Sequence, residues 1–182
     1  MNQRFHWILL GTALLTVGPL AHTRALAEDG IDACRLLRQA DVEAAFAPRK
    51  FDAGTPKKAA TRSSPTMAAV SGCTYNSAGA TARDRVTVSL LARRAPSDAA
   101  GVTPQVAKAG ALQLKATPVD VPGLGMGAYT VNLGSAAFPV IELNLFRGKR
   151  DWLVFGIAGV KLDTKAALAG LTKLAVAAQA RQ

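Results

Sequence analysis

The sequence predicts an α+β domain, in which helices at both ends pack on an antiparallel sheet of about five or six strands. Two helical patterns, one near residue 40 and one near residue 170, enclose segments in which apolar and polar residues alternate. Residues 139–146, which alternate, and 151–158, which are more uniformly apolar, are joined by a turn with glycine and predict an antiparallel hairpin. Residues 28–182 are expected to form one such domain.

Residues 1–27 are predicted to be a secretory signal peptide. Arg4 and His6 give a basic start, residues 7–21 form an apolar run, and Ala25-Leu26-Ala27 has the small-x-small pattern that signal peptidase needs. The run is shorter than the roughly 20 residues that span a bilayer as a helix. We therefore expect a periplasmic or secreted protein with no transmembrane segment after cleavage.

Two short helices are expected over residues 32–46, with a break or a new helix start at 39–41. Val42 and Phe46 are four residues apart, the spacing of a buried helical stripe, and Pro48 ends the segment. Residues 47–72 contain few large apolar side chains, so they are predicted to be a mobile loop with one weak strand near Phe51.

The middle of the chain is predicted to hold several short strands and one modest helix. The helix covers residues 97–111 and is interrupted near Pro104. Glycines at 123, 125 and 127 follow Pro122 and precede a strand, which favours a close-packed turn over a phosphate-binding loop. The expected strands are 73–76, 85–91, 112–119 and 128–133.

The last third of the chain is predicted to form the hairpin and a final helix. Residues 139–146 and 151–158 are the strands, and Gly148 lies in the turn between them. Ile141, Leu143 and Leu145 share one face of the first strand, and Glu142 and Asn144 lie on the other. The helix spans about 164–180 after an Asp163 N-cap, and Gly170 weakens it by about 1 kcal/mol.

Cys34 and Cys73 are predicted to form a disulfide, because both follow the signal segment and exported domains favour paired cysteines. The bond is expected to stabilise the fold by roughly 4 kcal/mol. The alternative is a lipoprotein in which Cys34 carries lipid. We reject it because Asp32 fits a lipobox poorly and because Cys73 would be left unpaired.

The sequence argues against an enzyme. His6 and His22, the only histidines, both lie in the signal segment, so histidine catalysis and imidazole metal ligands are excluded from residues 28–182. We therefore expect no catalytic residue, no metal and no cofactor. An enzyme that uses carboxylates alone is the least favoured function, and Glu142 is its best candidate residue.

The chain is basic, with a formal net charge of +10, and its lysines and arginines are dispersed in short groups. An exported basic protein meets anionic envelope components rather than nucleic acid. The expected partner is therefore an envelope protein or an anionic envelope component, although the charge is also explained by solubility alone.

The order of several short motifs resembles the small exported two-cysteine bacterial domains of unknown function, many of which are lipoproteins. The motifs are Cys34-Arg-Leu-Leu, Ala40 to Phe46, Cys73-Thr-Tyr75 and Val121-Pro-Gly-Leu-Gly125, followed by the hairpin and the final helix. The resemblance implies a helix-flanked antiparallel sheet whose first helix is joined to a Cys-x-Tyr strand, and it implies no activity. This chain departs from the lipoproteins in lacking a credible lipobox.

Three functions follow, in order of preference. The first is a soluble, exported, non-enzymatic binding or interaction module of the bacterial cell envelope. The second is a carrier of a small apolar ligand, with a groove between sheet and helices lined by Phe146, Trp152 and Phe155. The third is the carboxylate-only enzyme.

Overall fold

The computed structural model describes residues 31–58, 69–95, 101–160 and 162–181. The predicted signal peptide 1–27, the central residues 59–68 of the expected loop and the first part of the expected 97–111 helix lie outside these ranges. Within them, no helix is long and apolar enough to cross a membrane.

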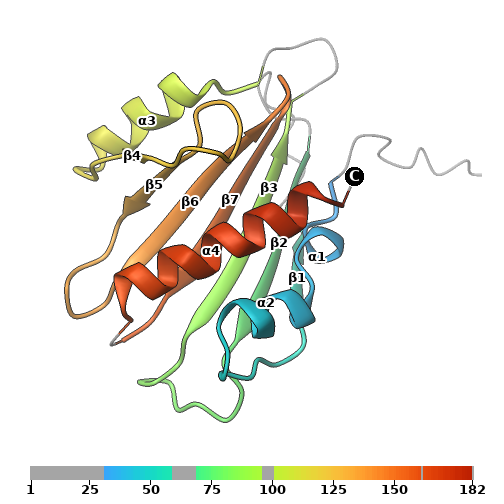
Figure 1. Ribbon diagram of the computed structural model, residues 1–182, viewed down its shortest axis with the longest axis vertical. Helices are drawn as coiled ribbons and strands as arrows, with labels where there is room; N and C mark the ends of the chain where they lie inside the picture. The colour runs from blue at the N-terminus through green and yellow to red at the C-terminus, as the bar shows by residue number, and fades with distance from the viewer. Residues whose placement is uncertain (1–30, 59–68, 96–100, 161, 182) are drawn as a thin grey trace, which may run out of the picture.

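The architecture is α+β, as predicted, but the antiparallel sheet has seven strands rather than five or six (Figure 1). Their order is β1-β2-β3-β7-β6-β5-β4, so the predicted hairpin of β6 and β7 is confirmed and β7 lies at the centre. The bounds are β1 Thr55–Lys58, β2 Ala69–Asn76, β3 Thr87–Arg94, β4 Val119–Asp120, β5 Tyr129–Asn132, β6 Val140–Arg147 and β7 Asp151–Ala158.

The predicted number of strands is wrong because of the two edge strands of the sheet, β1 and β4. β1 has the sequence Thr-Pro-Lys-Lys and lies inside the predicted loop, where a polar stretch with proline gives no strand signal. β4 has only two residues. The predicted strand 112–119 is wrong for most of its length, because a helix runs to Gln113 and is followed by a turn with Lys115 at φ 59°.

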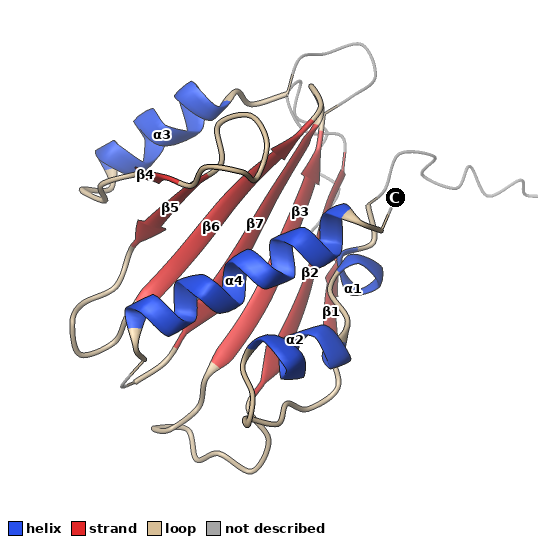
Figure 2. Cartoon of the chain, viewed as in Figure 1, coloured by secondary structure: helices blue, strands red, loops and turns tan. Residues whose placement is uncertain are grey.

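Four helices of the described segments accompany the sheet (Figure 2): α1 Ala33–Leu36, α2 Gln39–Ala45, α3 Pro104–Gln113 and α4 Thr164–Gln179. The predicted pair of short helices is confirmed, and so is the Asp163 N-cap, which accepts a hydrogen bond from the Ala166 amide. Pro104 begins α3 instead of interrupting it, since the first helical turn needs no proline N–H.

The main core lies between one sheet face and the helices α1, α2 and α4. A row of cross-strand partners, Leu90, Phe155 and Leu143, is fully buried there against residues of α4 such as Leu171. Gly170 has a packing role that offsets its low helix propensity, because a Cβ on it would lie 2.2 Å from the ring of Phe46.

The predicted disulfide is confirmed. Cys34 and Cys73 are joined with an S–S distance of 2.09 Å, which ties α1 to β2. Two residues further along β2, the Tyr75 hydroxyl donates a hydrogen bond to the Leu37 carbonyl oxygen. The disulfide and hydrogen bonds such as this one thus hold the short amino-terminal helices to the sheet.

Candidate functional site: a groove beneath helix α3

The opposite face of the sheet is only partly covered. Alternation along the strands sends Arg93, Glu142, Asn144 and Trp152 to this side, away from α4. Helix α3, which lies beside the edge formed by β4 and β5 in Figure 1, is the helix that reaches this face.

Helix α3 contacts the sheet through small side chains. Ala107 and Ala111 are buried against a second hydrophobic cluster that contains Tyr129, Val131 and Phe146. A groove of about 690 Å³ remains between the helix and strands β3, β7, β6 and β5. This volume is within the range of small-molecule sites.

Tyr129 and Trp152 line the groove, and both belong to a stack of aromatic rings with Phe146, which lies outside the lining. The ring centroids of Phe146 and Trp152 are 5.8 Å apart with an interplanar angle of 16°, and those of Tyr129 and Phe146 are 6.2 Å apart at 24°. The Arg93 guanidinium carbon lies 4.3 Å from the centroid of the Trp152 ring, which places a cation on the aromatic face.

The floor of the groove contains an incompletely hydrogen-bonded amide. The indole Nε1 of Trp152 donates a 2.9 Å hydrogen bond to Oδ1 of Asn144. Because an indole N–H is only a donor, this bond fixes which end of the amide is the oxygen. Asn144 is 2% exposed, and its Nδ2 is buried without a hydrogen-bond partner in the part of the chain that the structure describes.

Glu142 lies two residues from Asn144 on the same face of β6. Burial raises the pKa of this carboxyl, and the positive charge of Arg93 opposes that effect without cancelling it. Burial also raises the pKa of Tyr129 to about 12, with a smaller contribution from Glu142. No hydrogen bond to the Glu142 carboxylate is found within the described residues, and Arg93 is the positive charge that acts on it.

A glycine lies beside Glu142 on the floor of the groove. Gly156 is the cross-strand partner of both Glu142 and Ser89, and a Cβ on Gly156 would lie 2.9 Å from the Ser89 Oγ. A side chain at this position would therefore crowd the Ser89 hydroxyl.

The rim of the groove is apolar and partly open to solvent. Val106 and Leu114 from the α3 region are 62% and 71% exposed, and Leu133 is 40% exposed. Exposed aliphatic side chains around a concave surface are typical of binding sites. The site therefore combines apolar walls with a small polar floor.

The structure brings together two of the three residues predicted to line a groove. Phe146 and Trp152 are cross-strand partners on the groove side. Phe155 is not with them, because it is three residues from Trp152 and points to the other face, where it is fully buried in the main core. The predicted grouping is wrong for Phe155.

The sequence interpretation missed Arg93 and the unpaired amide of Asn144. The alternation of β6 placed Asn144 beside Glu142, but nothing in the sequence indicated that α3 would cover that face. Pairing of β3 with β7, which brings Arg93 to Trp152, joins segments about 60 residues apart. Such a contact leaves no local pattern.

The titratable side chains among the residues that line the groove are those of Arg93, Tyr129 and Glu142. Among the described residues no group of three or more histidine, cysteine, aspartate or glutamate side chains could hold a metal ion. Glu142 is the one carboxylate among the residues that line the groove, so an acid–base pair of carboxylates is not assembled there.

The fold and groove define a class: an α+β domain with a seven-stranded antiparallel sheet, a single disulfide and a half-open cavity beneath one helix. No family model matches the chain, and no curated protein matches it. The resemblance to exported two-cysteine domains stays a prediction.

One similar solved structure is the extracellular domain of PknH from Mycobacterium tuberculosis. The two chains are 11% identical with a TM-score of 0.45, and the match covers 82% of this chain and 95% of that chain. A similarity of this degree says nothing about ligand or activity.

Proposed function

We propose that this protein is an exported, non-enzymatic binding module of the bacterial cell envelope, and that it holds a small amphipathic molecule in the groove beneath α3. The single observation that carries the proposal is the buried, unpaired Nδ2 of Asn144 on the floor of an apolar groove. A buried donor without a partner costs about 1–3 kcal/mol, so its retention needs a reason, and a bound acceptor supplies one.

The polar residues on the floor of the groove determine which polar group of a ligand fits there. Asn144 offers a donor, and the Glu142 carboxylate offers an acceptor nearby on the same strand face. A ligand group with both an acceptor and a donor, such as an amide or a hydroxyl, satisfies both residues. The apolar rim residues Val106, Leu114 and Leu133 suit an aliphatic or aromatic body.

Export is supported by the Cys34–Cys73 disulfide, since such bonds persist in oxidising compartments. A non-enzymatic role is supported by the residues that line the groove, which include one carboxylate and no histidine or cysteine. An envelope protein as partner, the other expectation from the sequence, has no comparable feature in its favour.

The test uses Gly110, which lines the groove from α3 and has open space where a Cβ would be. The full chain is exported to a bacterial periplasm, purified without detergent and analysed by native mass spectrometry. We expect a bound small molecule in the wild-type protein. Gly110→Leu should lose it, because the side chain extends into the groove.

Gly110→Ala is the matched control, because it changes the same helical position and adds only one methyl group. We expect this variant to keep the bound molecule. A wild-type spectrum with no ligand would contradict the proposal, and so would a ligand that Gly110→Leu retains at the wild-type level.

A further inference from the structure

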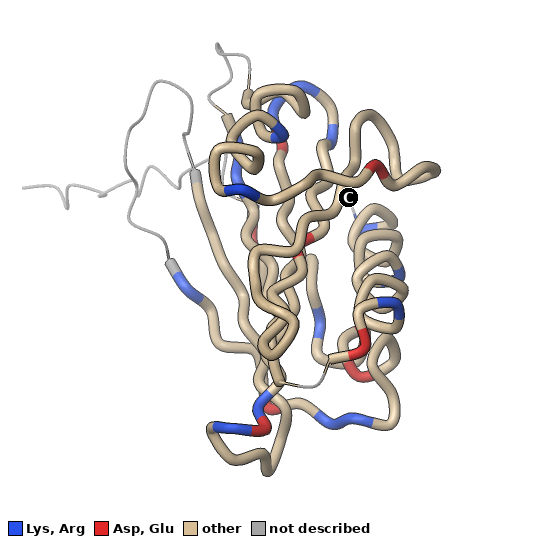
Figure 3. The backbone as a smooth tube through the Cα atoms, turned by 90° about the vertical axis from the view of Figure 1, so that its left-hand side faces the viewer, with Lys and Arg blue, Asp and Glu red and all other residues tan. Residues whose placement is uncertain are grey.

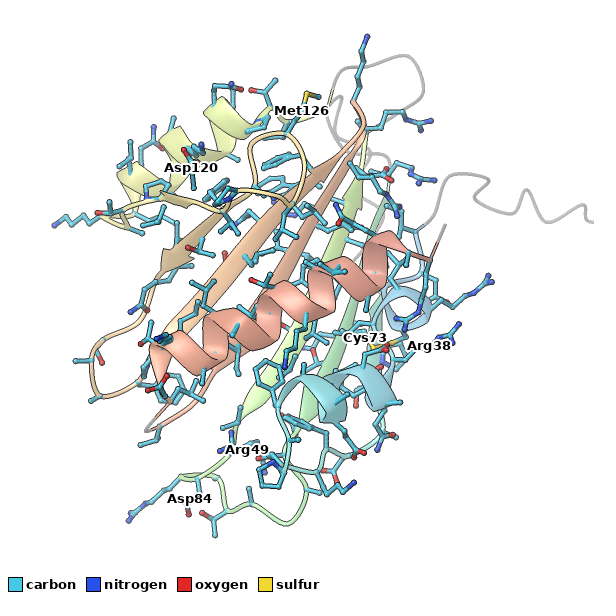
Figure 4. All side chains as sticks on the ribbon, in the orientation of Figure 1. Arg38, Arg49, Cys73, Asp84, Asp120 and Met126 are labelled. Carbon is cyan, nitrogen blue, oxygen red and sulfur yellow. A yellow bond between two sulfur atoms is a disulfide. The ribbon has the colours of Figure 1, made fainter. Side chains whose placement is uncertain are left out.

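A second concave surface, separate from the groove, is lined by five arginines: Arg35, Arg38, Arg94, Arg147 and Arg181. It has a volume of about 430 Å³ and lies on the other side of the sheet, where α1 begins and α4 ends. We refer to it as the arginine hollow. Arg38 is labelled in Figure 4, close to the disulfide residue Cys73.

Most lysines and arginines are spread over the molecule, as Figure 3 shows. The arginine hollow is therefore a local concentration of positive charge. Three aspartates of the described residues lie in or next to the hollow, namely Asp32, Asp41 and Asp151. The net charge of the hollow therefore depends on which groups these carboxylates pair with.

Asp151 is the carboxylate that holds two of the arginines in place. Arg94 donates to it through Nε and Nη2 at 2.7 and 2.9 Å, and Arg147 donates through the same two atoms at 3.2 and 2.9 Å. Two guanidinium groups thus donate to the same carboxylate. The Nη1 of Arg147 is buried and has no hydrogen-bond partner among the described residues.

The other two aspartates are also occupied. Asp41 accepts a 2.6 Å hydrogen bond from Arg181 Nη2, and its second oxygen accepts from the backbone amide of Arg38. Asp32 caps α1 by accepting from the amides of Cys34 and Arg35. These three aspartates, the carboxylates of the described residues in and next to the hollow, are thus already engaged.

The side chains of Arg35 and Arg38 are exposed, and among the described residues neither pairs with a carboxylate. The hollow therefore combines two immobilised guanidinium groups, a third held by Asp41, and two that are free to close over a ligand. Arginine binds tetrahedral oxyanions through paired N–H groups, and a concave, positively charged surface concentrates anions.

We propose that the arginine hollow binds a phosphate group. The group belongs either to free phosphate or to the headgroup of an anionic phospholipid, and the recognition chemistry is the same for both. This inference does not depend on the ligand of the α3 groove, because it concerns different residues on the other face of the sheet.

The test compares two double variants that remove equal charge. Arg35→Gln/Arg38→Gln removes the two unpaired arginines of the hollow, and both side chains are exposed, so the fold should be retained. Arg83→Gln/Arg85→Gln is the control, because both of these arginines are exposed and lie outside the hollow. Wild type and both variants are titrated at fixed ionic strength in two arms.

The first arm measures binding of inorganic phosphate by calorimetry, and the second measures binding to phosphatidylglycerol vesicles diluted with phosphatidylcholine. We expect the hollow variant to lose at least tenfold in affinity in one arm or both, while the control changes less than twofold. Binding in the first arm identifies free phosphate as sufficient, and binding confined to the second identifies the headgroup. No wild-type binding in either arm, or an equal loss in both variants, would overturn the proposal.

Discussion

Trp152 and Asn144 are joined by a 2.9 Å hydrogen bond from the indole Nε1 to the amide Oδ1, and this bond determines what the groove offers a ligand. It uses the acceptor of the amide and leaves the Nδ2 donor buried and unpaired. Stacking on Phe146 and the Arg93 guanidinium holds the indole from both sides. The unpaired donor is therefore presented by a rigid support, as recognition sites require.

Glu142→Gln is expected to make the unliganded protein more stable at neutral pH. The folded state raises the pKa of Glu142 above its ordinary value of 4.5, mainly through burial. The charged form is thus disfavoured by folding, and the neutral amide avoids that cost. We expect an increase of about 1 kcal/mol in the free energy of unfolding at pH 7, measured by urea denaturation.

The difference in stability between wild type and Glu142→Gln should depend on pH. Below about pH 4 the carboxyl is protonated in both the folded and unfolded states, so wild type and variant should be equally stable. As pH rises, the unfolded state releases the proton first, and wild type loses stability relative to Glu142→Gln. A variant less stable than wild type at pH 7 would contradict the assignment.

Asp151→Asn is expected to destabilise the protein at neutral pH by about 2 kcal/mol, because Arg94 and Arg147 lose their shared charge partner. Burial raises the pKa of Asp151, but the hydrogen bonds from both arginines outweigh it and the net pKa is below 3.8. This contribution is present above about pH 4 and is lost as pH falls through the folded pKa. Urea unfolding between pH 2 and 7 should show the two proteins converging at the acid end; a constant gap would be inconsistent with the pairing.

Two helical glycines should respond differently to alanine. Gly110→Ala adds a methyl group in open space and should stabilise the protein by about 0.5–1 kcal/mol through helix propensity. Gly170→Ala gains the same propensity but places a Cβ 2.2 Å from the Phe46 ring, which must move. Thermal unfolding should rank Gly110→Ala above Gly170→Ala. The reverse order would show that the α2–α4 contact is not as close as described.

Removal of the disulfide is expected to cost about 4 kcal/mol, because the bond closes a loop between residues 39 apart. The double variant Cys34→Ser/Cys73→Ser should unfold at lower urea than the oxidised protein. Reduced wild type serves as the control, and it should match the double variant. Equal midpoints for oxidised and reduced protein would rule out a stabilising role.

Much of the fold is predictable because its signals are local. β6 alternates, β7 is more uniformly apolar as a central strand would be, and Gly148 lies in the turn between them. Helix α4 has an apolar stripe with an Asp163 cap. The edge strand β1 has neither, since its pairing with β2 depends on neighbours rather than on its own residues. The position of β1 is therefore known from the three-dimensional structure and not from its sequence.

The groove was less predictable than the sheet. Alternation alone separates Trp152 from Phe155, so that error was avoidable from the pattern of β7. By contrast, the unpaired amide of Asn144 depends on the rotamer of Trp152 and on helix α3, which small residues such as Ala107 hold near the sheet. These contacts join residues from different strands and a helix, so local spacing in the sequence does not predict them.

The most direct test of the central claim is a crystal structure of the full chain purified from an exporting bacterium without detergent. The account predicts density for a small molecule beneath α3, with an acceptor atom of that molecule within hydrogen-bond distance of Asn144 Nδ2. A groove that contains only ordered water, with a water molecule as the sole partner of Nδ2, would contradict it.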